Sequence, residues 1–234
     1  GMLPKDVFST MNNATEILKK KINRNIFMSY GLRDFNKSLN LSDSVMQKNL
    51  YLRIVKPLFD RLMSFLLTLI LLPVGLLISI TLIIFHHRVF FRQFRSGKND
   101  HIFLFYKFYT IDPNSQESSS FQQFLRASSL DELPQLIHIL QGKMSFVGPR
   151  PLLPEYNDRY SKKHKIRNTV LPGLTGLVQI SGRNSLSWKE RLDLDAEYIR
   201  KVSFLYDLMI LYKTFFRFFG KSETQPSEKF TGYD

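Results

Sequence analysis

The stretch LMSFLLTLILLPVGLLISITLIIF, from Leu62 to Phe85, runs for about 24 residues without a charged side chain. A helix rises about 1.5 Å per residue, so one of that length can cross a hydrocarbon core of about 30 Å. A helix buried in a soluble core is the alternative, but such helices seldom stay free of charge for so long. The stretch therefore predicts a helix embedded in a membrane.

Pro73 lies near the middle of this apolar stretch. Proline removes a backbone donor and clashes with the preceding turn, so we expect Pro73 to kink the helix. The halves on either side, Leu62 to Leu72 and Val74 to Phe85, would each measure about 17 Å, roughly half of the hydrocarbon thickness.

Lysine and arginine residues flank both ends of the apolar stretch, although this bias normally marks only the cytoplasmic side of a membrane helix. We therefore expect residues 51–88 to form a re-entrant helical hairpin that enters and leaves the membrane by its cytoplasmic face. A straight span, in which the proline is merely tolerated, is the alternative. The flanking basic residues are Lys48, Arg53, Lys56 and Arg61 before the stretch and Arg88, Arg92, Arg95 and Lys98 after it.

The composition limits the class of protein further. The chain has 234 residues and a formal net charge of +13, which fits one domain with additions and a polyanionic partner such as an anionic membrane, a phosphorylated substrate or nucleic acid. No nucleic-acid-binding motif is visible, and the apolar stretch argues against a nucleic-acid binder. Cysteine is absent, which excludes disulfides, thiolate nucleophiles and cysteine metal sites.

Two aromatic and β-branched runs follow the apolar stretch: VFFRQFR, from Val89 to Arg95, and IFLFYKF, from Ile102 to Phe108. The residues between them are typical of a loop, so the runs predict a β-hairpin. Apolar residues then recur at helical spacing, before a Gln-Gly-Lys stop, at Leu133, Leu136, Ile137 and Leu140. The expected fold is mainly α with a short β-hairpin, in a monotopic membrane protein.

The segments outside this region are polar. Residues 1–50 form an extension with one pattern that fits an amphipathic helix, and residues 221–234 form a tail. Residues 89–220 are expected to form one domain that ends in SFLYDLMILYKTFFRFF, from Ser203 to Phe219, whose polar residues fall within an arc of about 120°. This profile fits a helix lying in the membrane interface, with Lys213 and Arg217 toward the headgroups, or a core helix with one solvated face.

The acidic residues Asp131 and Glu132 stand together in LRASSLDELPQL, from Leu125 to Leu136, in an otherwise basic chain. Ser129 and Glu132 have the spacing of a capping box, and acids are favoured in a first helical turn, so a purely structural role is one interpretation. Pro134 favours a helix that begins near it instead. In either position we expect unsatisfied backbone donors to keep the carboxylates ionised, ready to attack phosphorus or bind a divalent cation.

Three arginines occur in motifs that suit phosphate recognition. Arg126 precedes the acidic pair, Arg150 lies between two prolines in VGPRPLLPE, and Arg183 lies in PGLTGLVQISGRN. The second proline favours an extended backbone at Arg150, which presents its planar guanidinium with little freedom to lose. Together with the acidic pair, these arginines predict a site for a phosphorylated substrate.

Three blocks of sequence carry a resemblance to a known family: FFRQFRSGKN followed by YKF, FLRASSLDELPQLIHILQGKMSFVGPRPLLPEY, and VLPGLTGLVQISGRNSLSWKERLDLDAEYI. Over about residues 53 to 219 the chain resembles the bacterial sugar transferase family, the monotopic polyprenyl-phosphate sugar-1-phosphate transferases of the small phosphoglycosyl transferase type. The resemblance implies transfer of a sugar-1-phosphate from a nucleoside diphosphate sugar, by family habit a UDP-sugar, to undecaprenyl phosphate. It also implies that residues 89–220 are a catalytic domain on the cytoplasmic face of the bacterial inner membrane, in contact with its lipids.

The resemblance also assigns roles to single residues. Asp131 would attack phosphorus and form a phosphosugar-enzyme intermediate, and Glu132 would help to hold Mg²⁺ on the diphosphate. The side chains expected to hold phosphate oxygens are Arg126, Arg150, Arg183 and Lys107.

The chain departs from the family pattern in three places, one of which is a shorter loop from Thr110 to Phe121. Tyr109 stands where the family usually has an arginine, and His86-His87-Arg88 replaces a Ser-x-Gly-Pro motif. Because the acidic pair and the three arginines are retained, we expect an active enzyme, with a membrane-anchored pseudoenzyme or scaffold as the alternative. The sequence leaves open which sugar is transferred and whether the chain forms a homo-oligomer.

Overall fold

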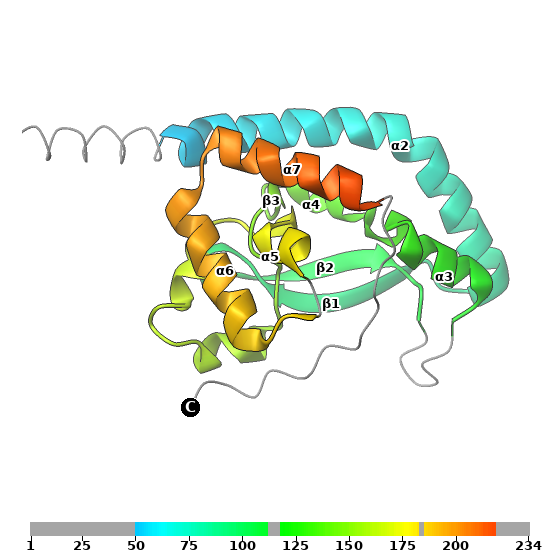
Figure 1. Ribbon diagram of the computed structural model, residues 1–234. Helices are drawn as coiled ribbons and strands as arrows, with labels where there is room; N and C mark the ends of the chain where they lie inside the picture. Colours follow the sequence, from blue (N-terminus) through cyan, green and yellow to red (C-terminus); the bar gives the residue numbers. More distant parts are fainter. Residues whose placement is uncertain (1–49, 112–117, 183–184, 219–234) are drawn as a thin grey trace, which may run out of the picture. The chain divides into compact units, whose positions relative to one another are not determined.

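The computed structural model of the protein describes residues 50–111, 118–182 and 185–218 (Figure 1). The predicted helix of the N-terminal extension and the polar tail lie outside the described residues. The elements in chain order are η1 (Tyr51–Val55), α2 (Lys56–His86), β1 (Phe90–Ser96), η2 (Lys98–Asp100), β2 (Ile102–Phe108), α3 (Ser120–Ala127), η3 (Leu130–Glu132), α4 (Gln135–Leu140), β3 (Ser145–Val147), η4 (Pro154–Arg159), η5 (Lys165–Thr169), β4 (Gly173–Thr175), α5 (Leu177–Ser181), α6 (Trp188–Lys201) and α7 (Phe204–Phe218). The prediction of a mainly helical fold with a short hairpin is confirmed.

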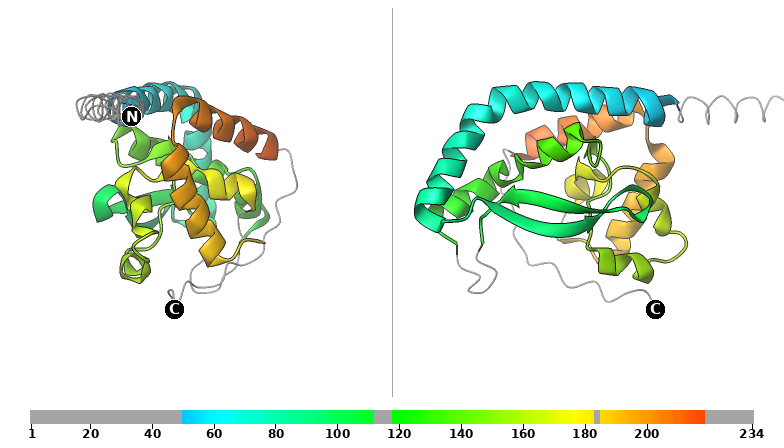
Figure 2. Two further views of the ribbon diagram at one scale, coloured as in Figure 1. Left: turned by 60° about the vertical axis from the view of Figure 1, so that its left-hand side comes forward. Right: turned by 180° about the vertical axis from the view of Figure 1, so that it is seen from behind.

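The helix α2 contains the apolar stretch and is 31 residues long. With η1 it is the one helix in the described part of the chain that is long and apolar enough to cross a membrane. Figures 1 and 2 show that it bends midway, so that its two halves run in different directions. Pro73 lies inside it and supplies a physical reason for a bend, because it removes one hydrogen bond of the helix.

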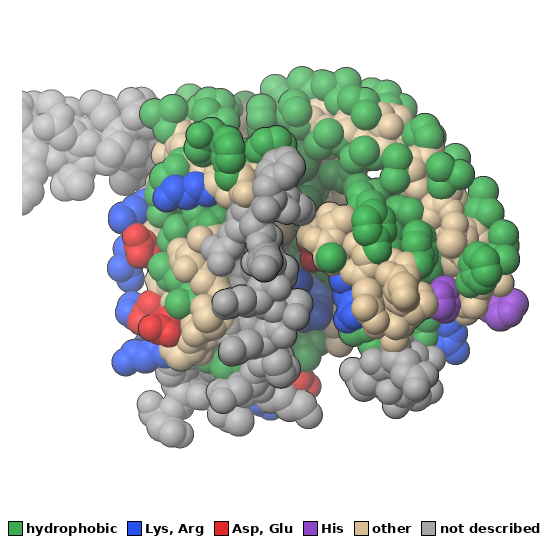
Figure 3. Space-filling model, turned by 45° about the vertical axis from the view of Figure 1, so that its right-hand side comes forward, with side chains coloured by type: hydrophobic (Ala, Val, Ile, Leu, Met, Phe, Trp, Pro, Cys, Tyr) green, Lys and Arg blue, Asp and Glu red, His purple; other side chains and the backbone are tan. Residues whose placement is uncertain are grey.

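The two halves of α2 pack against different parts of the same domain. In the first half, the Ser64 hydroxyl donates to the Leu136 carbonyl of α4 over 2.7 Å. In the second half, Ile78 and Leu82 form a buried cluster with Phe108 of β2 and Leu125 of α3. Both halves are therefore fixed to the domain, while the apolar side chains along the outer edge of α2 stay exposed and have no charged side chain among them in Figure 3.

The strands β1 and β2 pair in antiparallel register and form the predicted hairpin. Phe91 lies opposite Lys107 and Arg95 lies opposite Phe103. Directly opposite residues project from the same face of a ribbon, so Arg95 and Lys107 share one face. That face is the one that carries the buried Phe103 and Phe105.

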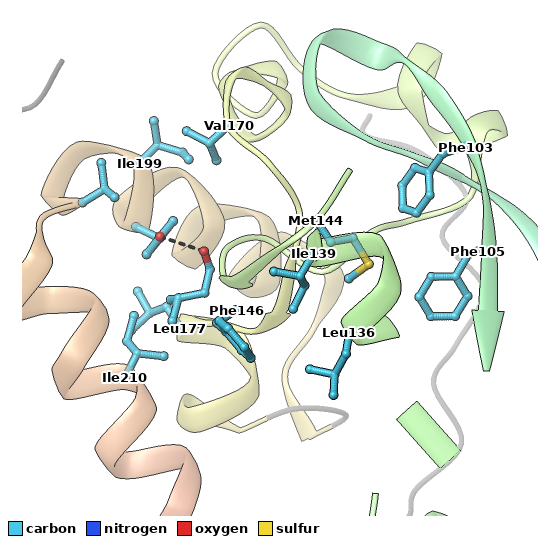
Figure 4. Packing of buried hydrophobic residues seen from close by; sticks show 13 residues of the cluster. Phe103, Phe105, Leu136, Ile139, Met144, Phe146, Val170, Leu177, Ile199 and Ile210 are labelled. Carbon is cyan, nitrogen blue, oxygen red and sulfur yellow. Dashed lines mark hydrogen bonds between the residues drawn. The ribbon is translucent and has the colours of Figure 1, made fainter. Parts of the chain in front are cut away.

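The main core lies between the hairpin and the C-terminal helices (Figure 4). Leu136 and Ile139 of α4 lie at its centre, and Ile210 of α7 closes it from the side away from the hairpin. A short parallel pair, β3 with β4, runs through it. The sequence did not predict this pair, because strands of three residues are too short for an alternating pattern. Ile137 of the predicted apolar face is 48% exposed.

The helix α7 is amphipathic, but part of its polar face is turned toward the domain. Asp207 is 4% exposed and accepts hydrogen bonds from Tyr51 over 2.5 Å and Tyr198 over 2.8 Å, with Lys56 as its ion-pair partner. The expectation that the whole polar arc faces headgroups or solvent is therefore wrong for Asp207, although Lys213 is exposed. The exposed face of α7 is apolar instead and carries Phe204, Leu205, Leu208, Tyr212, Phe215 and Phe216.

Candidate active site

Asp131 lies in η3, the single turn between α3 and α4, and is 6% exposed. The turn begins at Ser129, whose φ of 55° is in the left-handed region and whose side chain makes no capping hydrogen bond. The capping-box interpretation is therefore wrong. The next helix instead begins at Gln135, with Pro134 before it, so the alternative of a helix starting near the proline is confirmed. A left-handed backbone conformation is uncommon for serine. At Ser129 it turns the chain so that the acidic pair lies between α3 and α4.

Lys107 is the cationic partner of Asp131. Its Nζ lies 3.6 Å from the Asp131 Oδ2 atom, and it also lies over the ring of Phe91, 5.6 Å from the centroid. The hairpin register places Lys107 on the buried face of the ribbon, so the strand delivers the ammonium group to η3. The predicted lysine and the predicted nucleophile are thus brought together.

The electrostatic surroundings of Asp131 differ from the expectation. Burial is the largest influence and raises the pKa of this carboxyl; Lys107 opposes the rise and Glu132 adds to it. The sequence predicted that backbone donors would favour ionisation, whereas in the structure a lysine side chain favours it. The ionised carboxylate is therefore poorly solvated and has one cation beside it, which suits a nucleophile.

Glu132 points to a different partner from Asp131. Its Oε1 lies 3.4 Å from an Nη2 atom of Arg150, and both side chains reach solvent, at 23% and 55% exposed. The geometry leaves the second carboxylate oxygen of Glu132 and most of the Arg150 guanidinium available for a ligand. The structure thus brings together two residues from motifs that lie apart in the sequence.

Arg150 is held in place through its backbone by Arg167, a residue that the sequence did not single out. Arg167 is 3% exposed, donates to the Arg150 carbonyl over 2.6 Å and is paired with Asp195 of α6 at 3.0 Å. It lies in no recognisable motif, and burial alone distinguishes it from other arginines. We regard it as a positioning residue.

The loop that carries Arg150 also depends on a close approach of two backbones. A Cβ atom on Gly173 would lie 2.1 Å from the Gly148 nitrogen, and the Gly173 nitrogen donates to the Pro149 carbonyl over 2.9 Å. The absence of a side chain at Gly173 therefore lets β4 lie against the residues before Arg150.

The remaining predicted residues are Arg126, Arg183 and Pro73. Arg126 is exposed at the end of α3 and donates to the Ser118 hydroxyl over 3.1 Å. Arg183 lies outside the described residues. Pro73 lies in α2, and Tyr109 is buried with the Arg88 guanidinium 6.0 Å from its ring centroid, so another cation stands near the position of the missing arginine.

The donor set around Glu132 fits a magnesium ion that relies on its substrate. In the described part of the chain no group of three or more His, Asp or Glu side chains is arranged to hold a metal, while Asp131 and Glu132 are adjacent. Mg²⁺ is commonly bound by one or two carboxylates together with substrate phosphates and water. Glu132 is the better candidate ligand, because Asp131 is more deeply buried and paired with Lys107.

Comparison with known sequences gives several related proteins. An uncharacterized sugar transferase of Bacillus subtilis (strain 168), EpsL, is 41% identical over 136 residues, which is 54% of this chain and 67% of that protein. The UDP-glucose:undecaprenyl-phosphate glucose-1-phosphate transferase of Xanthomonas campestris pv. campestris is 32% identical over 205 residues, 78% of this chain and 42% of its own length. The undecaprenyl-phosphate galactose phosphotransferase of Salmonella typhimurium (strain LT2) is 40% identical over 101 residues, 43% of this chain and 21% of its own length.

The chain thus matches less than half of the length of two of these three relatives. The sequence profile of the family described as bacterial sugar transferase, by contrast, matches residues 51–221. That range includes every element from η1 to α7 and therefore the whole candidate site. On this match, the chain belongs to the bacterial sugar transferase family.

Proposed function

We propose that the protein transfers a sugar-1-phosphate from a UDP-sugar to undecaprenyl phosphate, as an initiating step of surface polysaccharide or glycoconjugate assembly. The observation that carries the proposal is the buried Asp131 carboxylate, with Lys107 at 3.6 Å and the Glu132–Arg150 pair beside it. The names of the relatives from Xanthomonas and Salmonella include a sugar-phosphate transfer to undecaprenyl phosphate, and this is the chemistry that such a site suits.

The reaction would proceed in two displacements at Asp131. In the first, a carboxylate oxygen of Asp131 forms a bond to the sugar-bearing phosphorus, the bond from that phosphorus to the bridging oxygen breaks, and UMP leaves with the electron pair. In the second, a phosphate oxygen of undecaprenyl phosphate attacks the same phosphorus and the Asp131–phosphorus bond breaks. Each step transfers between two anions, and Lys107 and Arg150 offset their repulsion.

Mg²⁺, when bound, would neutralise charge on the diphosphate, with Glu132 as its protein ligand. The Arg150 guanidinium would orient the diphosphate, because its planar fork can donate to two phosphate oxygens at once. Arg167 fixes the backbone of Arg150, which limits the freedom that this side chain has to lose on binding.

The proposal includes a placement at the membrane, which the packing of α2 and α7 supports. Because Ile78 and Leu82 of the second half of α2 pack on the same domain as Ser64 of the first half, a re-entrant path is favoured over a straight span. The outward apolar face of α7 would lie in the interface beside it. The domain would then stand on the cytoplasmic face of the inner membrane, with Asp131 near the headgroups where the acceptor phosphate lies.

The test uses the purified full chain in nanodiscs, with Mg²⁺, undecaprenyl phosphate and either UDP-glucose, UDP-galactose or a broader panel of UDP-sugars. We expect UMP release that Asp131→Asn abolishes, whereas Asp193→Asn, on the solvent side of α6 and paired with Lys163, should retain it. Mass spectrometry after a quench without acceptor should find a phosphosugar on Asp131. No turnover with any donor would refute the transferase, and turnover without label on Asp131 would refute the two-step path.

The role of Glu132 has its own measurement. Glu132→Gln should require more Mg²⁺ for half-maximal activity while the protein stays folded, because one charged ligand is lost. An unchanged Mg²⁺ titration would remove Glu132 from this role.

A further inference from the structure

We propose that Arg95 binds the phosphate of the nucleoside monophosphate that leaves in the first displacement. The proposal rests on the proposed function and adds to it a residue for the nucleotide side of the donor. Arg95 lies on β1, on the same face of the hairpin as Lys107.

The hairpin register sets the order of the two cations along the site. Lys107 lies opposite Phe91, which is four residues before Arg95 on β1. At about 3.3 Å of rise per residue, the two positions are about 13 Å apart along the ribbon. Long cationic side chains can converge from that separation on a sugar diphosphate, with Lys107 at the nucleophile end and Arg95 at the nucleotide end.

The partners of Arg95 leave its charge uncompensated. Its Nη2 donates to the neutral amide of Gln93 over 2.6 Å, its guanidinium lies 5.7 Å from the ring centroid of Phe105, and no carboxylate forms an ion pair with it among the described residues. Its Nε is closed off from water without a hydrogen-bond partner. A buried donor left unpaired is costly, which favours a role that a ligand completes.

The positive charge of Arg150 further disfavours the charged form of Arg95. Burial lowers the pKa of Arg95 to about 10, and the charge of Arg150 contributes to the lowering. The two arginines are kept near each other by the chain, because the Ser96 nitrogen next to Arg95 donates to the Leu152 carbonyl two residues after Arg150 over 2.9 Å. Two like charges held near each other, of which only Arg150 has an acidic partner in Glu132, favour the binding of a further anion.

The reaction supplies that anion at this place. When the bridging bond breaks, negative charge grows on the phosphate of the departing UMP. Arg150 is paired with Glu132, and Lys107 is paired with Asp131. On this face of the hairpin, Arg95 is therefore the cation that forms no ion pair with an acidic residue of the described ranges. Its guanidinium is therefore suited to offset the charge of the leaving group.

The experiment compares Arg95→Gln with Arg92→Gln in the full chain, in detergent, by calorimetric titration with UMP and with uridine. Arg92 is the matched control, because it lies on the same strand but on the opposite face, 5.8 Å from the Tyr106 ring centroid. We expect Arg95→Gln to weaken UMP binding about 10- to 100-fold, to leave uridine binding and the KM for undecaprenyl phosphate unchanged, and to raise the KM for the donor. Arg92→Gln should change none of these.

Arg95→Lys should restore part of the UMP affinity and carries the same test if Arg95→Gln does not fold. The inference is overturned if these variants bind UMP as the wild type does, or if uridine binding falls as much as UMP binding, which would indicate a general distortion. If the wild type neither binds UMP nor turns over any donor, the proposed function fails and the inference with it. Wild-type turnover with an unchanged donor KM in Arg95→Gln defeats the inference alone.

Discussion

Replacing Lys107 with methionine should move the acidic limb of the pH–rate profile to higher pH. The Lys107 Nζ and the Asp131 Oδ2 are 3.6 Å apart, a separation at which two unit charges attract by about 1 kcal/mol in water and about 2 kcal/mol at half its dielectric constant. Because the Lys107 side chain is 29% exposed, solvent screens part of the attraction, and we use these two values rather than the larger one of a dry interior. Losing the attraction raises the pKa of Asp131 further and changes its ratio of ionised to protonated forms about 5- to 30-fold at a given pH.

The assay is kcat/KM for the donor, measured as UMP release across the acidic and neutral range. Activity should require the ionised carboxylate, so it should rise with pH through the raised pKa of Asp131 in both proteins, but later in the variant. Lys189→Met, which removes an exposed lysine of α6, should leave the limb where it is in the wild type.

An acidic limb at the same pH in Lys107→Met and the wild type would refute this reasoning, even if the plateau fell. That result would assign Lys107 to the substrate phosphate alone. A lower plateau together with a displaced limb would show that the lysine serves both the nucleophile and the phosphate.

Three further substitutions separate activity, backbone packing and the packing of α2 on the domain. Asp131→Asn should abolish UMP release but raise the melting temperature. The pKa of Asp131 in the folded protein lies above the unfolded value of 3.8, so the folded state is relatively most stable below that value and loses stability as pH rises through the raised pKa. The neutral asparagine does not undergo this loss. Calorimetry should therefore find a larger gain at about pH 8 than at about pH 5. Gly173→Ala should prevent folding, because its Cβ would lie 2.1 Å from a backbone nitrogen. Gly75→Ala, whose Cβ would have nothing within 4 Å, should melt no lower than the wild type in the same scan, because alanine favours a helix interior over glycine. Leu82→Ala should cost about 3 kcal/mol of unfolding free energy, because its fully buried side chain leaves a cavity. Denaturant titration should show a far smaller cost for Ile83→Ala, whose side chain is 53% exposed, and equal costs would contradict the anchoring of the second half of α2.

The parts of the fold that the sequence predicted are those with long or repeated local patterns. The apolar stretch with Pro73 predicted α2, and the alternating aromatic runs predicted the hairpin. The strands β3 and β4 were missed because strands of three residues are too short for an alternating pattern. The buried orientation of Asp207 was missed because two of its partners, Tyr51 of η1 and Lys56 of α2, lie far away in sequence.

The candidate site shows the same division. The motifs around Asp131, Glu132 and Arg150 could be recognised, and the structure brings the acidic pair together with Arg150 and Lys107. Sequence motifs do not predict how deeply each of these side chains is buried or which residues contact it. The raised pKa of Asp131 comes mainly from burial. The hydrogen bond by which Arg167 supports Arg150 is a tertiary contact, which the spacing of residues in the sequence does not predict.

The ion pair between Lys56 of α2 and Asp207 of α7 has a practical consequence for preparing the enzyme. A fragment shortened to start at β1 would lack Lys56 and leave the Asp207 carboxylate, which is 4% exposed, buried without its cationic partner. Such a change typically costs several kcal/mol of folding free energy. The shortened fragment would also still expose the aromatic outer surface of α7, an apolar patch that promotes aggregation in water. The hydrophobic arm is thus part of the folded unit rather than a removable tether, and lipid or detergent has to accompany the protein from extraction to assay.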